Sequence, residues 1–131
     1  MSLFYNKIQR KNPSSPEEPA KWYLSLRSTG LVKEEEVAEL IADETTLNPK
    51  EAEMSLAQLQ KVLIQTLLNG QTIQLGSWGS FYLTLNSEGV ESEDEVSPSL
   101  VKKINIRFSA GKSLKEAIAK ASFKDVDSLT K

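Results

Sequence analysis

Basic side chains occupy alternate positions near the end of the chain, in a pattern that is typical of a strand. Residues 102–108 (KKINIRF) would place Lys103 and Arg107 on one face and the apolar side chains on the other, with Lys102 beside them. Lysine and arginine are side chains that bind phosphate well. A solvated strand face also carries such residues, so the pattern alone leaves both interpretations open.

Two further lysines, Lys112 and Lys115, lie at the start of a predicted last helix. Ser113 would begin this helix, with Glu116 in the capping-box position. Backbone N–H groups and the helix dipole favour an anion at such an end, and the two lysines add to that preference. The alternative is a simple exposed, capped helix end.

Composition excludes several classes of chemistry. The 131 residues include no Cys and no His, which excludes disulfide scaffolds, Cys/His zinc sites and His-dependent catalysis. The carboxylates of 34–44 and 88–95 are interpreted as a solvated helix face and a flexible loop, so we expect no enzyme, metal, cofactor or small-molecule substrate. No apolar run reaches the roughly 20 residues of a membrane span, and no signal peptide follows Met1, which predicts a cytoplasmic domain without membrane contact.

The formal net charge of −2 hides a segregation of charge along the chain. Residues 1–31 and 101–131 are net positive, and the middle of the chain is net negative, with no Lys or Arg in 69–100. Such an asymmetry can mark a nucleic-acid surface built from the two ends. It is equally compatible with acidic and basic faces that pair with each other or with a second subunit.

The first third of the chain changes from strand to helix character. Residues 3–10 are predicted as a strand, and 21–28 as a second strand, although a short helix fits the latter nearly as well. A proline-rich loop separates the two segments. From Leu31 the apolar spacing becomes helical, and Glu34, Glu35 and Glu36 form an acidic first turn that suits the positive end of the helix dipole.

A longer helix is predicted over 49–68, where Asn48 is a good N-cap and Glu51 can close a capping box. Its apolar arc is broader than one neighbouring layer would cover. The residues of this arc are Ala52, Leu56, Ala57, Leu59, Leu63, Ile64, Leu67 and Leu68. We infer that the helix packs against a second copy of the chain; a fully buried core helix in a monomer is the alternative.

Three strands follow, over 71–75, 80–86 and 102–108. A glycine turn joins the first two, and a long polar segment with no predicted core separates the second from the third. The order of elements is therefore helix, helix, three strands, helix, which is an α+β arrangement.

Two sequence motifs carry a family resemblance. The first is the turn Gly76-Ser77-Trp78-Gly79-Ser80-Phe81, and the second is Phe108-Ser109-Ala110-Gly111-Lys112-Ser113-Leu114-Lys115-Glu116-Ala117 at the entry to the last helix. With the spacing between them, they resemble the HU/integration-host-factor family of bacterial histone-like DNA-binding proteins. The resemblance covers about 31–121, and residues 1–30 lie outside the common core, as in longer HU-like variants.

The resemblance implies an intertwined homodimer. Two helices at the start of the core and a C-terminal helix would form its base, and a three-stranded antiparallel sheet would extend as an arm over 86–101. The 1–30 segment would be an N-terminal extension with strands, and 122–131 a C-terminal tail. The implied function is that of a nucleoid-associated architectural protein that contacts phosphate and minor groove of double-stranded DNA with little sequence specificity.

The resemblance also assigns candidate DNA-binding positions to this chain. These candidates are Lys102, Lys103, Arg107, Lys112, Lys115, Ser77 and Ser80. Arg10 and Lys11 lie outside the common core and are added as candidates because they could extend the basic surface and partly replace the arm. Trp78 stands where the family usually has Phe, and we expect it to pack rather than to stack on bases.

One departure from the family favours a second hypothesis. Family arms are basic and end in an Arg-Asn-Pro tip, whereas 86–101 carries five carboxylates and no Lys or Arg. Such a segment repels phosphate, so it is disordered, contacts another protein, or covers a basic surface of its own dimer. The alternative function is therefore a protein-interaction or structural module with weak or no DNA binding.

Overall fold

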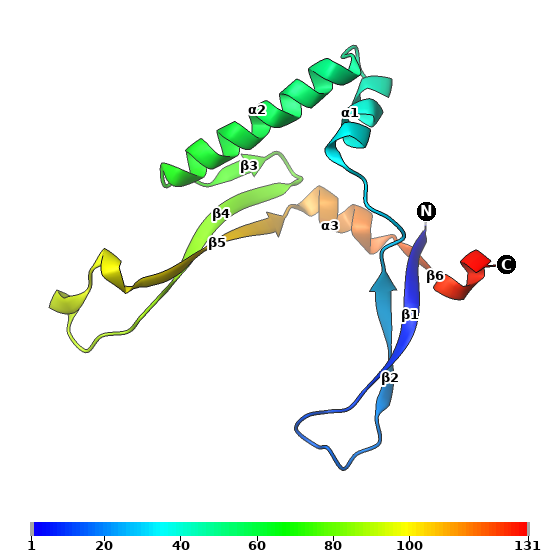
Figure 1. The fold of residues 1–131 in the computed structure, drawn as a ribbon, viewed down its shortest axis with the longest axis horizontal. Coiled ribbons are helices and arrows are strands. Elements are labelled where there is room, and N and C mark those ends of the chain that lie inside the picture. Colours follow the sequence, from blue (N-terminus) through cyan, green and yellow to red (C-terminus); the bar gives the residue numbers. More distant parts are fainter. Residues whose placement is uncertain (1, 131) are drawn as a thin grey trace. The chain divides into compact units, whose positions relative to one another are not determined.

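The computed structural model describes residues 2–130, which form two compact units (Figure 1). The central unit is Glu34–Ala117. The terminal unit is built from both ends of the chain, up to Lys33 and from Ile118 onward. Each unit contains one three-stranded sheet.

The long helix of the central unit begins where its capping residue Asn48 predicts. Helix α1 spans Glu34–Asp43 and helix α2 spans Pro49–Leu68. The Asn48 side-chain oxygen accepts a hydrogen bond from the Glu51 backbone N–H at 2.9 Å, and the Glu51 carboxylate accepts one from the Asn48 N–H at 3.3 Å. The predicted capping box is thus confirmed, and it satisfies two N–H groups that a helix start leaves unpaired.

The sheet of the central unit has the strand order β3-β4-β5 and is antiparallel throughout. Its strands are β3 (Ile73–Leu75), β4 (Gly79–Ser87) and β5 (Val101–Ala110). Helix α3 (Lys112–Ala119) follows directly. The predicted order of helix, helix, three strands and helix is confirmed.

The long connection between β4 and β5 contains two short 3-10 helices, η1 (Glu93–Glu95) and η2 (Pro98–Leu100). A backbone hydrogen bond of 2.9 Å from the Glu88 N–H to the Leu100 carbonyl closes its base. We call this connection, residues 88–100, the acidic loop. It lies at the end of the β4–β5 ribbon that is distant from α3 (Figure 1).

The terminal unit has the strand order β2-β1-β6. Strands β1 (Ser2–Arg10) and β2 (Lys21–Arg27) form an antiparallel hairpin, which confirms the strand interpretation of 21–28 over the short helix. Strand β6 (Ser122–Asp125) pairs in parallel with β1 and leads into the 3-10 helix η3 (Val126–Thr130). This strand was not predicted within the C-terminal tail 122–131, because its four residues are held by a partner at the other end of the chain.

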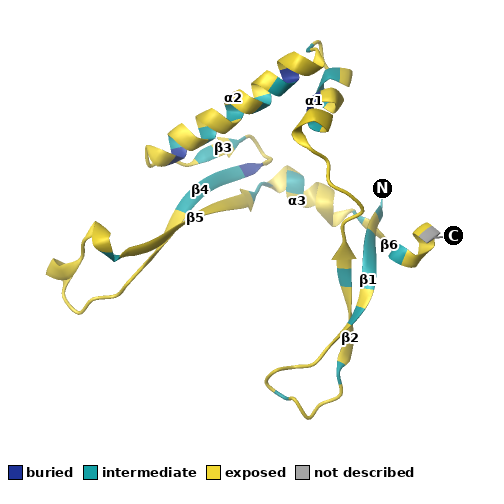
Figure 2. Cartoon of the chain, in the orientation of Figure 1, coloured by how far each residue is buried: buried dark blue, intermediate teal, exposed yellow. Residues whose placement is uncertain are grey.

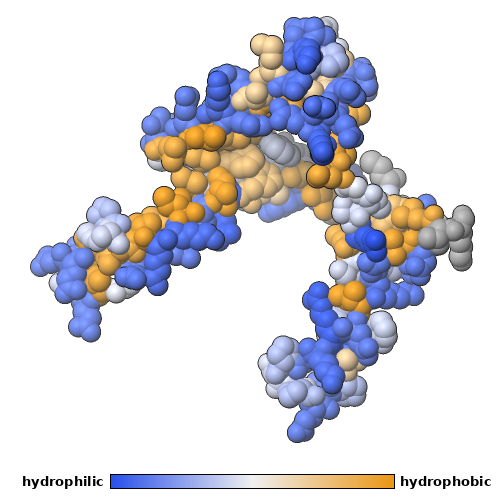
Figure 3. Space-filling model, in the orientation of Figure 1, coloured by the Kyte–Doolittle hydropathy of each residue, from blue (hydrophilic) through white to orange (hydrophobic). Residues whose placement is uncertain are grey.

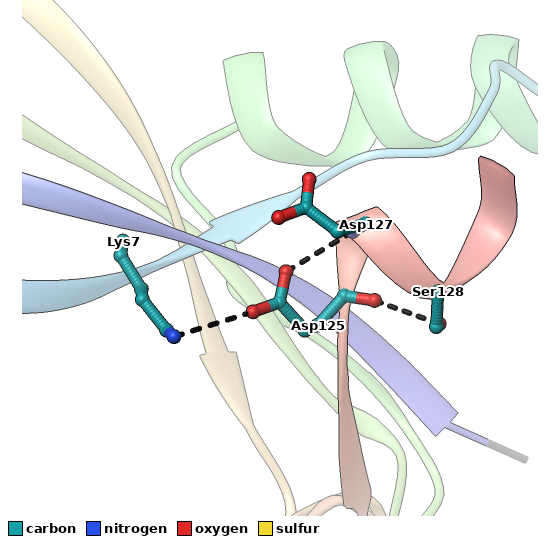
Figure 4. A network of polar contacts seen from close by, with 4 residues as sticks. All are labelled: Lys7, Asp125, Asp127 and Ser128. Atoms are coloured by element: carbon teal, nitrogen blue, oxygen red, sulfur yellow. Dashed lines mark hydrogen bonds and ion pairs between the residues drawn. The ribbon is translucent and has the colours of Figure 1, made fainter. Parts of the chain in front are cut away.

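An ion pair joins β6 to β1, and two hydrogen bonds hold the turn that follows β6. The Lys7 ammonium lies 3.7 Å from the Asp125 carboxylate, whose other oxygen accepts a hydrogen bond from the Asp127 backbone N–H at 3.0 Å (Figure 4). The Ser128 hydroxyl donates to the Asp125 carbonyl at 2.7 Å. Asp125 therefore joins the strand β6 to β1 and to the turn that follows.

Little apolar surface is buried within one chain (Figure 2). Of residues 2–129, whose burial the structure describes, only Ala38, Ala52 and Leu67 are buried apolar residues. Apolar side chains gather instead on the open surface along α2 and the β4–β5 ribbon (Figure 3). Among the exposed ones on these elements are Val62, Ile64, Leu68, Leu85, Ile104, Ile106 and Phe108.

Candidate functional site

The β4–β5 ribbon separates its polar and apolar side chains onto opposite faces. The register places Tyr82 opposite Arg107 and Asn86 opposite Lys103, while the alternating positions pair apolar residues such as Phe81 with Phe108. Directly opposed residues in an antiparallel pair point to the same side of the sheet. The predicted facing of Lys103 and Arg107 is confirmed, and we call the face that they share with Tyr82 the basic face.

The middle of the basic face is polar, and two of its side chains are hydrogen-bonded to each other. Thr84 lies opposite Asn105, and the Asn105 amide donates to the Asn86 side-chain oxygen at 3.2 Å. The bond between Asn105 and Asn86 was not predicted. The alternation of polar residues on both strands is the signal that links them.

Lys102 stands apart from this alternation. Ser87 pairs with Val101 and Asn86 with Lys103, so Lys102 has no partner on β4 and marks a β-bulge. A bulge bends the strand and redirects the side chain of the extra residue. Lys102 is therefore next to Lys103 in sequence but outside the regular register of the basic face.

The glycine turn and the start of α3 are tied together. The Ser77 and Ser113 hydroxyls lie 2.8 Å apart, and the Ser113 hydroxyl also donates to the Ser77 carbonyl at 2.9 Å. The Gly111 N–H donates to the Trp78 carbonyl at 2.8 Å. These bonds place the turn, and with it the candidate Ser77, against the helix end that carries Lys112 and Lys115.

The start of α3 differs from the prediction. The helix begins at Lys112, one residue early, and its first turn closes with a hydrogen bond from the Lys115 N–H to the Gly111 carbonyl at 3.1 Å. The predicted capping box of Ser113 and Glu116 is wrong, because Ser113 lies inside the helix and its hydroxyl bonds the turn. Glu116 instead lies 4.0 Å from the exposed Lys112 ammonium.

Trp78 packs on the phenylalanine pair of the sheet. Its ring centroid lies 6.0 Å from that of Phe81 and 5.4 Å from that of Phe108, and the two phenylalanine centroids are 4.9 Å apart. The expectation of a packing role for Trp78 is confirmed. Gly79 permits this packing, since a Cβ there would lie 2.5 Å from the Phe108 ring.

The remaining candidates have different surroundings. Ser80 is half-buried and lies opposite Ser109, on the same face as Tyr82. Arg10 and Lys11 belong to the terminal unit, where Arg10 ends β1 and lies opposite Lys21. Within residues 2–130, no helix is long and apolar enough to cross a membrane, and no three or more His, Cys, Asp or Glu side chains are grouped so that they could hold a metal ion.

Comparison with known proteins identifies the family. Residues 1–125 match the family model HU-HIG, described as an HU domain fused to a wHTH, Ig or glycine-rich motif. The chain belongs to this HU-HIG family. The resemblance to HU proteins that the two motifs carry is thereby confirmed, and the family model extends it over residues 1–30 as well.

Two solved structures share the fold. A crystal structure of an inferred DNA-binding protein from Bacteroides vulgatus matches with a TM-score of 0.66 and 14% identity over 95% of this chain and 48% of that chain. An HU–DNA cocrystal structure from Anabaena matches with a TM-score of 0.54 and 21% identity over 68% of this chain and 99% of that chain. This HU-HIG chain thus spans about half the length of the Bacteroides protein and contains nearly the whole HU fold. No curated protein sequence is significantly similar to it.

Proposed function

We propose that this HU-HIG chain is an architectural DNA-binding protein. In this proposal it binds double-stranded DNA as a homodimer, contacts phosphates and the minor groove with little sequence specificity, and acts in the bacterial nucleoid of the cytoplasm. Family membership and the fold shared with the Anabaena HU–DNA structure support this role.

The observation that carries the proposal is the separation of faces on the β4–β5 ribbon. Arg107 and Lys103 lie four positions apart on one strand, about 13 Å along it, and both lie opposite polar residues of β4. Neither has an ion-pair partner among residues 2–130. Two unneutralised cations on an open face are available for the charge-assisted bonds that phosphate oxygens accept.

A second copy of the chain would bury the opposite face. A groove of about 290 Å³ between α2 and the sheet is lined by Leu63, Ile64, Leu67, Phe81 and Ile106. Ile64 and Ile106 are 59% and 57% exposed. Apolar surface of this extent is costly to leave in water, and monomeric proteins rarely expose it. In the proposed dimer the basic faces of both copies line one DNA-binding surface.

Lys112, Lys115, Ser77 and Ser80 are proposed to support phosphate contacts at the edge of this surface. The hydrogen bonds between the turn and α3 hold the two lysines at a fixed place relative to β4. Lys102, redirected by the bulge, is proposed to add charge at the distal end of the ribbon.

A second function is favoured by the acidic loop. Its five carboxylates, Glu88, Glu91, Glu93, Asp94 and Glu95, are all exposed, and no cation lies within the loop. If these charges prevent DNA from approaching the ribbon, the chain is a protein-interaction or structural module with an HU fold. Only the first of the two functions predicts DNA binding that weakens as the salt concentration rises.

The test is fluorescence anisotropy with a labelled duplex of about 30 bp at about 50 and about 200 mM salt. The wild-type chain should bind at the lower salt, and Lys103→Glu/Arg107→Glu should abolish binding. A matched control, Lys50→Glu/Lys61→Glu on α2, reverses as many charges and should still bind. Absence of wild-type binding at the lower salt would support the interaction module, and equal binding by both variants would remove the basic face from the proposal.

A further inference from the structure

The β1–β2 hairpin ends in a loop that its own bonds hold in shape. The Asn12 side-chain oxygen accepts from the Ser14 N–H at 3.0 Å, and the Asn12 carbonyl accepts from the Ser15 N–H at 3.1 Å. A second turn closes with a 3.0 Å bond from the Glu18 N–H to the Ser15 carbonyl. Three prolines restrict the backbone further. They are Pro13, Pro16 and Pro19.

A pocket of about 360 Å³ opens where this loop meets the strands. Three cationic side chains line it, from Arg10, Lys11 and Lys21, together with the Tyr23 ring and the Glu18 carboxylate. Asn12, Pro13 and Pro19 complete the lining. A pocket with three cations and one carboxylate retains a net positive charge at neutral pH.

Contacts within the fold do not account for the three cations that line this pocket. Arg10 and Lys21 lie directly opposite each other in the hairpin register, and like charges in that position destabilise a strand pair. None of the three pocket cations has an ion-pair partner within residues 2–130. Lys7, on the same strand, differs because Asp125 neutralises it (Figure 4).

We propose that this pocket binds a backbone phosphate of DNA, as a second contact site that the β4–β5 basic face does not include. This inference rests on the proposed DNA-binding function. A guanidinium forms paired hydrogen bonds with phosphate oxygens, and the two ammonium groups add charge-assisted bonds. A bound phosphate would also remove the repulsion between Arg10 and Lys21. The loop is held in place before binding, so little conformational entropy is lost.

The hairpin then supplies positive charge that the acidic loop lacks. Residues 10–21 at the β1–β2 tip carry three cations and two carboxylates, whereas 88–100 carries five carboxylates and no cation. The DNA backbone is anionic, so it is attracted to the first and repelled by the second. The β1–β2 tip thus adds a DNA contact in the terminal unit to the one proposed for the basic face, while the acidic loop makes none.

The first test replaces the three cations with neutral polar residues in Arg10→Gln/Lys11→Gln/Lys21→Gln. The control, Lys33→Gln/Lys120→Gln/Lys124→Gln, removes as many charges from exposed positions of the terminal unit outside the pocket. Each lost phosphate contact should reduce the ratio of affinities at about 50 and about 200 mM salt by about threefold. The pocket binds one phosphate per chain, so we expect the pocket variant to lower this ratio about threefold per chain and the control to leave it near the wild-type value.

The results separate this inference from the proposed function. If the pocket variant matches its control while Lys103→Glu/Arg107→Glu loses binding, the pocket does not contact DNA and the proposed function stands. If the wild-type chain itself does not bind DNA, the proposed function fails first. Far-UV circular dichroism checks that the variants retain their sheets.

A crosslinking experiment tests the site without removing any charge. The chain has no cysteine, so Ser14→Cys at the hairpin tip and Ser99→Cys in the acidic loop each offer one thiol for a benzophenone probe. Irradiation with labelled duplex should crosslink the tip strongly and the acidic loop weakly. Equal crosslinking, or crosslinking from the acidic loop alone, would overturn the assignment.

Discussion

The uncovered apolar groove makes a quantitative prediction about self-association. Complete burial of an isoleucine side chain stabilises by about 1.5–3 kcal/mol. Ile64 and Ile106 are 59% and 57% exposed in one chain, so a second copy can bury more than half of each. Each side chain then contributes about 1 kcal/mol, and a symmetric dimer contains four of them. Ile64→Ala/Ile106→Ala should therefore weaken the dimer by about 4 kcal/mol, or about 1,000-fold in Kd.

Sedimentation velocity over a range of chain concentrations measures this change. The control is Val90→Ala/Val96→Ala, which truncates two exposed apolar side chains in the acidic loop, away from the groove. Its dissociation constant should stay within a few-fold of the wild-type value. The reasoning is refuted if the wild-type chain is monomeric at micromolar concentration, or if the groove variant and the control associate equally well.

Three further predictions concern single features of the fold. Asn48→Ala removes the capping box that Asn48 forms with Glu51, so it should lower the free energy of unfolding by about 1 kcal/mol. Urea denaturation measures this change, and an unchanged free energy of unfolding would mean that the cap does not stabilise the fold. Gly111→Ala places a methyl group against the Ser77 carbonyl, so it should lower the free energy of unfolding by about 1–3 kcal/mol in the same assay. An unchanged denaturation midpoint would contradict the close contact between Gly111 and the glycine turn. Deleting residues 88–96 of the acidic loop should tighten DNA binding at fixed salt, because carboxylates repel phosphate, and unchanged affinity would show that the loop does not reach DNA.

Local sequence signals predicted most of the fold. The capping residues Asn48 and Glu51 and the alternation in 102–108 act over a few residues, so the pattern alone reveals them. Strand β6 was not predicted, because it pairs with β1 at the other end of the chain and its own four residues carry no local signal. The cap at Ser113 was predicted wrongly for a related reason, since its hydroxyl is used by Ser77, 36 positions away.

The candidate site was predictable in part. Alternation alone placed Lys103 and Arg107 on one face, and the register confirms this, but the bulge at Lys102 depends on how two strands align and leaves no local signal. The opposition of Arg10 and Lys21 was likewise hidden until the hairpin register was known. Whether these residues contact DNA stays a prediction for the binding experiments.

The central claim is that two copies of this HU-HIG chain form one surface that holds DNA by its phosphates. Sedimentation of the full chain with a labelled duplex of about 30 bp tests it most directly, at about 50 mM salt and again at about 500 mM. We expect a complex of two chains per duplex at the lower salt that dissociates at the higher one. A duplex that sediments alone at the lower salt, or a complex with a single chain, would contradict it.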